Sequence, residues 1–163
     1  MTRRYRASWL HFSPRGSQSS AVQHDRVAKA LVAAAASADP RTVGRMLHAG
    51  VELTVDAGGK VPAPRSALSG ASEVGRYLSG VLLEPAASLR VASVNGMPGV
   101  VVCRGGEVIG VLGIRLRRRR IVQAWLVVNP EKLTGWGVEC SASEAALSRG
   151  GMSQIRRLSC RSW

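Results

Sequence analysis

The chain has 163 residues and a formal net charge of +13, with 45% hydrophobic but only 4% aromatic residues. A chain of this length buries one core of ordinary size, and here that core has to be built from Ala, Val, Leu and Ile. No apolar stretch approaches the roughly 20 residues that a membrane-spanning helix needs. These numbers exclude a membrane-spanning helix and favour one globular domain with tails.

The N-terminus and the cysteines bear on the cellular compartment. The apolar stretch after the first arginines is too short for a signal peptide, although an Arg- and Ser-rich segment without acids also fits an organelle transit peptide. Cys103, Cys140 and Cys160 are odd in number and far apart, without the two-residue spacing of metal knuckles and redox motifs. We therefore expect a cytoplasmic protein with reduced, unpaired thiols, no metal and no cofactor, and Cys103 buried in a strand.

The positive charge is spread along the chain, which weakens it as a sign of one binding surface. Residues 1–24 carry four arginines and no acids, residues 25–136 carry fifteen Lys and Arg against eight acids, and residues 137–163 carry four against two. Twenty of the 23 basic residues are arginine, which genomic base composition explains as well as selection for phosphate contacts.

The first half of the predicted domain is helical. Apolar residues recur at helical spacing from Val27 to Ala35, and Asp39-Pro40 forms a helix start that leads to a second helix ending before Gly50. The alternation over Val51–Asp56 predicts a half-buried strand. Ser72–Leu83 then predicts a third helix with one apolar face.

The second half has the period of strands. Four β-branched runs are separated by Asn95-Gly96, by Gly105-Gly106 and by an arginine run, and the first two separators are typical of hairpin turns. Gly110 and Gly113 predict a bend or bulge in the longest strand. We expect an α+β fold in which three helices cover one face of a strongly bent antiparallel sheet. Its strands are predicted over residues 89–94, 99–103, 108–116 and 121–128.

Four segments resemble the C-terminal domain of sigma-J-type extracytoplasmic-function sigma factors, in the same order and at similar spacing over about 110 residues. They are Val51–Lys60 (VELTVDAGGK), Gly70–Leu78 (GASEVGRYL), Val94–Val101 (VNGMPGVV) and Val128–Leu133 (VNPEKL). The resemblance implies the cone-shaped, nuclear transport factor 2-like fold of SnoaL-like proteins over residues 25–136. The flanking segments 1–24 and 137–163 are predicted to be disordered.

The resemblance also implies partners and exclusions. Proteins with this cone fold bind small apolar ligands or catalyse reactions such as ketosteroid isomerisation in the cone, and they often form homodimers through the open face of the sheet. The chain departs from the family at Ala57, where a third glycine is usual, and at the basic last hairpin. The two N-terminal sigma-factor domains have no counterpart in residues 1–24. We expect a bacterial transcription regulator that does not work as a sigma factor by itself.

Three side chains are candidates for catalysis, and each also has a structural interpretation. Isomerisation needs a buried carboxylate as base and an oxyanion donor, which points to Asp56 with Tyr77 or His48. Asp56 equally suits the cap of the Gly58-Gly59 turn. His48 suits a helix C-terminus, and Tyr77 suits the core with its hydroxyl at the pocket edge.

Two further groups of residues are candidates for binding. Gln123 and Trp125 are predicted to share a strand face with Ile121 and Val127, and they would line the ligand pocket with Tyr77 and Asp56 if that face lines the cone. Arg117, Arg118, Arg119 and Arg120 are candidates for nucleic-acid contact, or else form a solvated hairpin tip. The leading hypothesis is a non-catalytic ligand-binding or regulatory domain. A small cyclase or isomerase and a basic nucleic-acid-binding module are the alternatives.

Overall fold

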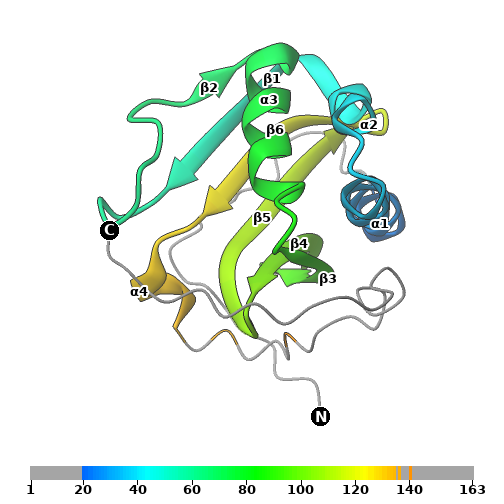
Figure 1. Cartoon of the computed structure of the whole chain (residues 1–163). Helices are drawn as coiled ribbons and strands as arrows, with labels where there is room; N and C mark the ends of the chain where they lie inside the picture. Colours follow the sequence, from blue (N-terminus) through cyan, green and yellow to red (C-terminus); the bar gives the residue numbers. More distant parts are fainter. Residues whose placement is uncertain (1–19, 135, 137–139, 141–163) are drawn as a thin grey trace, which may run out of the picture.

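The computed structural model describes residues 20–134, 136 and 140, which form four helices and six strands (Figure 1). The predicted helices and the four predicted strands of the second half are all present, with ends that shift by a few residues. The helices are α1 (Ala21–Ala36), α2 (Pro40–Met46), α3 (Ala71–Leu82) and α4 (Pro130–Leu133). The strands are β1 (Leu47–Asp56), β2 (Leu68–Ser69), β3 (Ser88–Val94), β4 (Met97–Arg104), β5 (Glu107–Arg117) and β6 (Arg120–Val127).

The six strands form one curved sheet in the order β2-β1-β6-β5-β4-β3. Strands β3 to β6 follow one another as antiparallel neighbours, which confirms the predicted meander. Strand β1 joins the far side of β6 in parallel, and this pairing was not predicted. Alternation within a strand reports which residues are buried, whereas strand direction depends on the path of α3 and the meander between β1 and β6.

Helices α1, α2 and α3 lie over one face of the sheet and enclose the larger core (Figure 1). The apolar stripes predicted for α1 and α3 supply Leu31 and Leu78, and β1 supplies Val51 and Leu53. All four side chains have 0% exposure. The core on this face is completed by inward residues of β4, β5 and β6, among them Val100, Val102, Leu112, Ile121, Ala124 and Leu126.

A second, smaller core lies on the opposite face of the sheet, where the chain returns after β6. Strand residues such as Val101 and Val127 pack there with Leu133 of α4. Cys140 lies in the same cluster and forms a disulfide with Cys103 of β4, across 37 residues of sequence. Cys103 is buried in a strand as predicted.

The prediction of unpaired thiols is therefore wrong for Cys103 and Cys140. Their separation in sequence says nothing about their separation in space, and the chain after α4 folds back onto the strand that holds Cys103. Disulfides are rare in reducing compartments, so the thiols no longer support a cytoplasmic location. None of the helices among the described residues is long and apolar enough to cross a membrane.

Irregularities bend β5 and β6. Val102 pairs with Gly110 and Cys103 with Val108, so Ile109 is an extra residue. It lies beside Gly110, one of the two glycines at which a bend or bulge was predicted. Such a bulge increases local twist, as the glycines of β5 had indicated. A second irregularity, not predicted, leaves Val122 as an extra residue of β6.

The two central residues of each hairpin turn in the meander have positive φ, but the residue types differ between the turns. Asn95-Gly96 and Gly105-Gly106 have positive φ, as two-residue hairpins require. The turn between β5 and β6 has φ of 48° at Arg118 and 65° at Arg119. A residue with a side chain loses roughly 1–2 kcal/mol in this left-handed region, so the chain carries strain here that the other two turns reduce with glycine.

Candidate functional site

Asp56 lies at the C-terminal end of β1, where its carboxylate is used for structure. One oxygen accepts a hydrogen bond from the backbone N–H of Gly58 (3.2 Å), and the other accepts one from the ammonium of Lys132 (2.6 Å). The backbone carbonyl of Asp56 accepts hydrogen bonds from Val128 and Asn129. The predicted role of Asp56 as a turn cap is confirmed, and its ionic partner Lys132 was not predicted.

This turn joins two of the four segments that carried the resemblance. Gly58 has φ of 58°, and a β-carbon there would stand 2.2 Å from the side-chain nitrogen of Asn129. Asn129 is buried and caps α4 by accepting a hydrogen bond from Glu131 N–H. The carboxylate of Glu131 in turn pairs with Lys60 at 3.1 Å. These contacts join residues 56–60 to residues 129–132.

Among the described residues, the side-chain hydrogen bonds of Asp56 come from Gly58 and Lys132 and involve neither Tyr77 nor His48. Tyr77 is half-buried on α3 against the larger core, and this desolvation raises the pKa of its hydroxyl above the ordinary value. His48 is exposed near the start of β1, and its ring Nδ1 accepts a hydrogen bond from the N–H of Gly50 (3.1 Å). Asp56 belongs to the other end of the same strand, so the length of β1 separates it from His48.

Gln123 and Trp125 lie on the sheet face that points away from α1–α3. Their neighbours in β6, Ala124 and Leu126, belong to the larger core, and successive side chains of a strand point to opposite faces. Both residues are half-buried. The prediction that Ile121 shares their face is wrong, because the extra residue Val122 shifts Ile121 to the helix-covered side.

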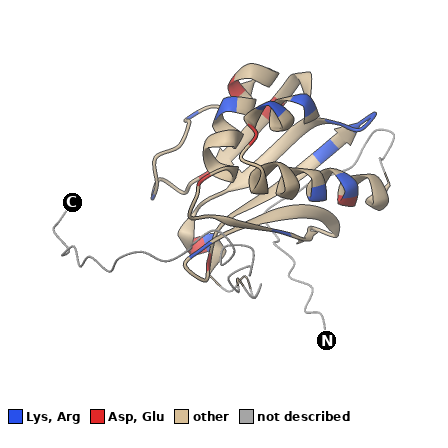
Figure 2. Ribbon diagram, turned by 45° about the vertical axis from the view of Figure 1, so that its right-hand side comes forward, with Lys and Arg blue, Asp and Glu red and all other residues tan. Residues whose placement is uncertain are grey.

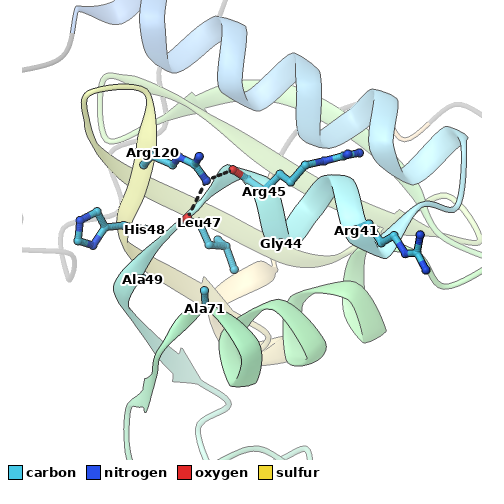
Figure 3. Close-up of a pocket in the computed structure, with 8 residues that line it drawn as sticks. All are labelled: Arg41, Gly44, Arg45, Leu47, His48, Ala49, Ala71 and Arg120. Atoms are coloured by element: carbon cyan, nitrogen blue, oxygen red, sulfur yellow. Dashed lines mark hydrogen bonds between the residues drawn. The ribbon is translucent and has the colours of Figure 1, made fainter.

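A hollow of about 680 Å³ opens between α2, the start of β1 and the start of α3 (Figure 3). Apart from His48, the polar side chains of its lining are three arginines. Figure 3 shows Arg120 at the end of the β5–β6 hairpin, with its guanidinium turned toward the backbone where α2 meets β1. The hollow is lined by Arg41, Gly44, Arg45, Leu47, His48, Ala49, Ala71 and Arg120.

Arg120 fastens the hairpin to α2. Its Nη1 donates hydrogen bonds to the carbonyls of Arg45 and, at 3.3 Å, of Leu47. The last carbonyls of a helix have no partner within the helix and carry partial negative charge, so this guanidinium acts as a C-terminal cap for α2. Arg117, Arg118 and Arg119 stay exposed at the tip. Arg120 therefore differs from the other three predicted nucleic-acid contacts.

The start of α2 is capped by Asp39. A hydrogen bond from the Thr42 hydroxyl lowers the pKa of this carboxyl, helped by the Arg41 N–H and the nearby Arg45 guanidinium. Arg41 and Arg45, one helical turn apart, were not singled out from the sequence, although their spacing places them on one side of α2. Within the described part of the chain, no three His, Cys, Asp or Glu side chains gather closely enough to hold a metal ion.

Comparison with known proteins relates the chain to a sigma factor. It is 31% identical over 123 residues to the ECF RNA polymerase sigma factor SigJ of Mycobacterium tuberculosis, which covers 69% of this chain and 39% of SigJ. The crystal structure of SigJ matches with a TM-score of 0.54 and 30% identity over 69% of this chain and 44% of that one. The match thus spans well under half of SigJ.

Two smaller proteins share the fold. A nuclear transport factor 2-like protein from Mesorhizobium loti has a TM-score of 0.50 and 15% identity over 70% of this chain and 97% of its own. A SnoaL-like protein from Burkholderia thailandensis has a TM-score of 0.50 and 17% identity over 66% of this chain and 96% of its own. No family model matches the chain.

Proposed function

Because this chain contains a nuclear transport factor 2-like domain related to the C-terminal domain of sigma-J-type sigma factors, we propose that the domain regulates transcription by binding and catalyses no reaction. The observation that carries the proposal is the burial of the side chains between the helices and the sheet. Large side chains from every layer meet there with less than 2% exposure, among them Leu31, Leu53, Leu78, Leu112, Ile121 and Leu126.

The burial of these side chains favours binding on the outer surface over binding of a small apolar ligand inside the cone. A ligand there would have to displace packed side chains, whereas ligand sites are usually largely formed before binding. The alternative of an isomerase receives no support from the geometry. The carboxylate of Asp56 is occupied by hydrogen bonds from Gly58 and Lys132.

The proposal is tested in a transcription reaction reconstituted from RNA polymerase, the related SigJ and a promoter that SigJ uses. We expect added full-length chain to change the transcript yield until the effect saturates, as binding to a complex requires. A reaction with an unrelated sigma factor is the control and should not change. The Asp56→Asn variant should act like the natural chain, because the proposal gives Asp56 no chemical role.

A transcript yield that stays constant as the chain is added would contradict the proposal. So would an effect that Asp56→Asn abolishes while the variant remains folded by circular dichroism, since that result would give the carboxylate a direct part in the activity.

We further propose that the domain forms a homodimer through the face of the sheet that points away from the helices. Side chains from three neighbouring strands form a row on this face, because Gln123 of β6 pairs with Glu52 of β1 on one side and with Arg115 of β5 on the other. Glu52 and Arg115 are exposed. A two-fold axis near Gln123 would set Glu52 of each copy against Arg115 of the other, which makes the face self-complementary.

Replacing Glu52 with arginine is expected to weaken this dimer. The change sets like charges against each other at two symmetric contacts, so we expect the dissociation constant to rise by at least about tenfold. Sedimentation equilibrium measures it. The double variant Glu52→Arg/Arg115→Glu should restore pairing, and Arg65→Glu, in the loop between β1 and β2, should have little effect. A natural chain that stays monomeric at high concentration would rule out the dimer.

A further inference from the structure

Arginines from two distant segments meet at one end of the domain. Arg41 and Arg45 lie on α2, while Arg117, Arg118 and Arg119 lie at the β5–β6 hairpin. The hydrogen bonds from Arg120 to the carbonyls of Arg45 and Leu47 join the two segments. Figure 2 shows the basic hairpin projecting beside the helical layer. We call the five exposed arginines Arg41, Arg45, Arg117, Arg118 and Arg119 the basic end.

The basic end has a large surplus of positive charge. All five side chains are exposed. Over the described residues, the ion pairs of this group are limited to that of Arg45 with Asp39, at 3.5 Å. Asp39 is also occupied with capping α2. Most of the positive charge is therefore available to an anionic partner.

The φ angles of the β5–β6 turn are a second, independent observation about the basic end. The other two turns of the meander have glycine in the left-handed region, at Gly96 and at both Gly105 and Gly106. The β5–β6 turn has Arg118 and Arg119 there instead, both strained by their side chains. A turn that needed only to reverse the chain would be more stable with glycine, so the strain at Arg118 and Arg119 distinguishes this turn from the other two.

We propose that the basic end binds the phosphate backbone of duplex DNA without reading its base sequence. Guanidinium groups bind phosphate oxygens in a two-pronged geometry, and duplex DNA presents closely spaced phosphates. Apart from the ring of His48, the lining of the adjoining hollow has no aromatic side chain on which single-stranded bases could stack. The hydrogen bonds of Arg120 join the hairpin to the end of α2, so the arginines of the two segments lie on parts of the fold that are held together.

The test compares the full chain with its Arg118→Asn/Arg119→Gly variant by fluorescence anisotropy on a mixed-sequence DNA duplex. The variant loses two charges and gains a preferred turn, so it should unfold at a higher urea concentration while binding DNA more weakly. We expect its dissociation constant to rise at least about tenfold near 100 mM salt, and its salt slope to fall by about 1.8, from the loss of two phosphate contacts.

The matched control is Arg65→Gln/Arg76→Gln, which removes the same charge from exposed positions outside the basic end. It should bind nearly as well as the natural chain. Equal losses in both variants, or unchanged binding and salt slope in the turn variant, would overturn the proposal. Displacement of the duplex by polyglutamate at the same charge concentration would also overturn it, in favour of an acidic protein partner. The DNA-binding assay contains no polymerase, so a negative result in it would not contradict the proposal that the domain regulates transcription.

Discussion

Replacing Cys140 with serine is expected to lower the free energy of unfolding by roughly 4 kcal/mol, the loss that chain entropy predicts for a disulfide closing a loop of this length. The Cys103–Cys140 bond spans 37 residues and ties the segment after α4 to the sheet. Without it, the smaller core around Val101, Val127 and Leu133 would also lose part of its cover. Urea unfolding followed by circular dichroism measures the change.

The control is Cys160→Ser, which leaves the Cys103–Cys140 bond in place. This variant should unfold at the same urea concentration as the natural chain. Adding a dithiol reductant to the natural chain should reproduce the effect of Cys140→Ser and should have no further effect on that variant. A natural chain whose unfolding is insensitive to the reductant would show that the bond does not form in solution.

The elements that were predictable are those whose signal is local. The N-cap Asp39 with Pro40, the apolar stripe of α3 and the turn residues Asn95-Gly96 each act over a few neighbouring residues. Their physical cause is contained in the same short stretch of sequence. The helices, the meander and the bulge beside Gly110 were accordingly predicted close to where they lie.

The features that were missed depend on residues far apart in the chain. The ion pair of Asp56 with Lys132 joins positions 76 residues apart, and the cap that Arg120 provides for α2 joins positions 75 residues apart. The cysteines were judged by their spacing in sequence, which does not report the return of the chain onto β4. The face of Ile121 in β6 was predicted wrongly, because the pleat reverses at the extra Val122.

The candidate site shows the same division. The capping role of Asp56 was predictable because the Gly58-Gly59 turn follows it directly. The surroundings of the other two candidates were not predictable, since Tyr77 is placed by the packing of α3 and His48 by the junction of α2 with β1. A list of titratable side chains from the sequence therefore named the residues but not their grouping.

Glycine substitutions at two positions are expected to change stability in opposite directions. Gly99 of β4 lies between β3 and β5, and a β-carbon there would stand 2.6 Å from the Leu112 carbonyl oxygen and 2.7 Å from Val94 Cγ2. The carbonyl belongs to the backbone of β5, which cannot give way without distorting the sheet. We expect Gly99→Ala to lower the free energy of unfolding by about 2–3 kcal/mol, as overpacking of a filled site does.

Gly44→Ala is the matched change at an open position. Gly44 lies within α2, and a β-carbon there would meet nothing within 4 Å. Alanine is more favourable than glycine in a helix interior by about 0.8–1.0 kcal/mol, so this variant should unfold at a higher urea concentration than the natural chain. A Gly99→Ala variant that was as stable as the natural chain, or more stable, would contradict the close approach of β5 to Gly99.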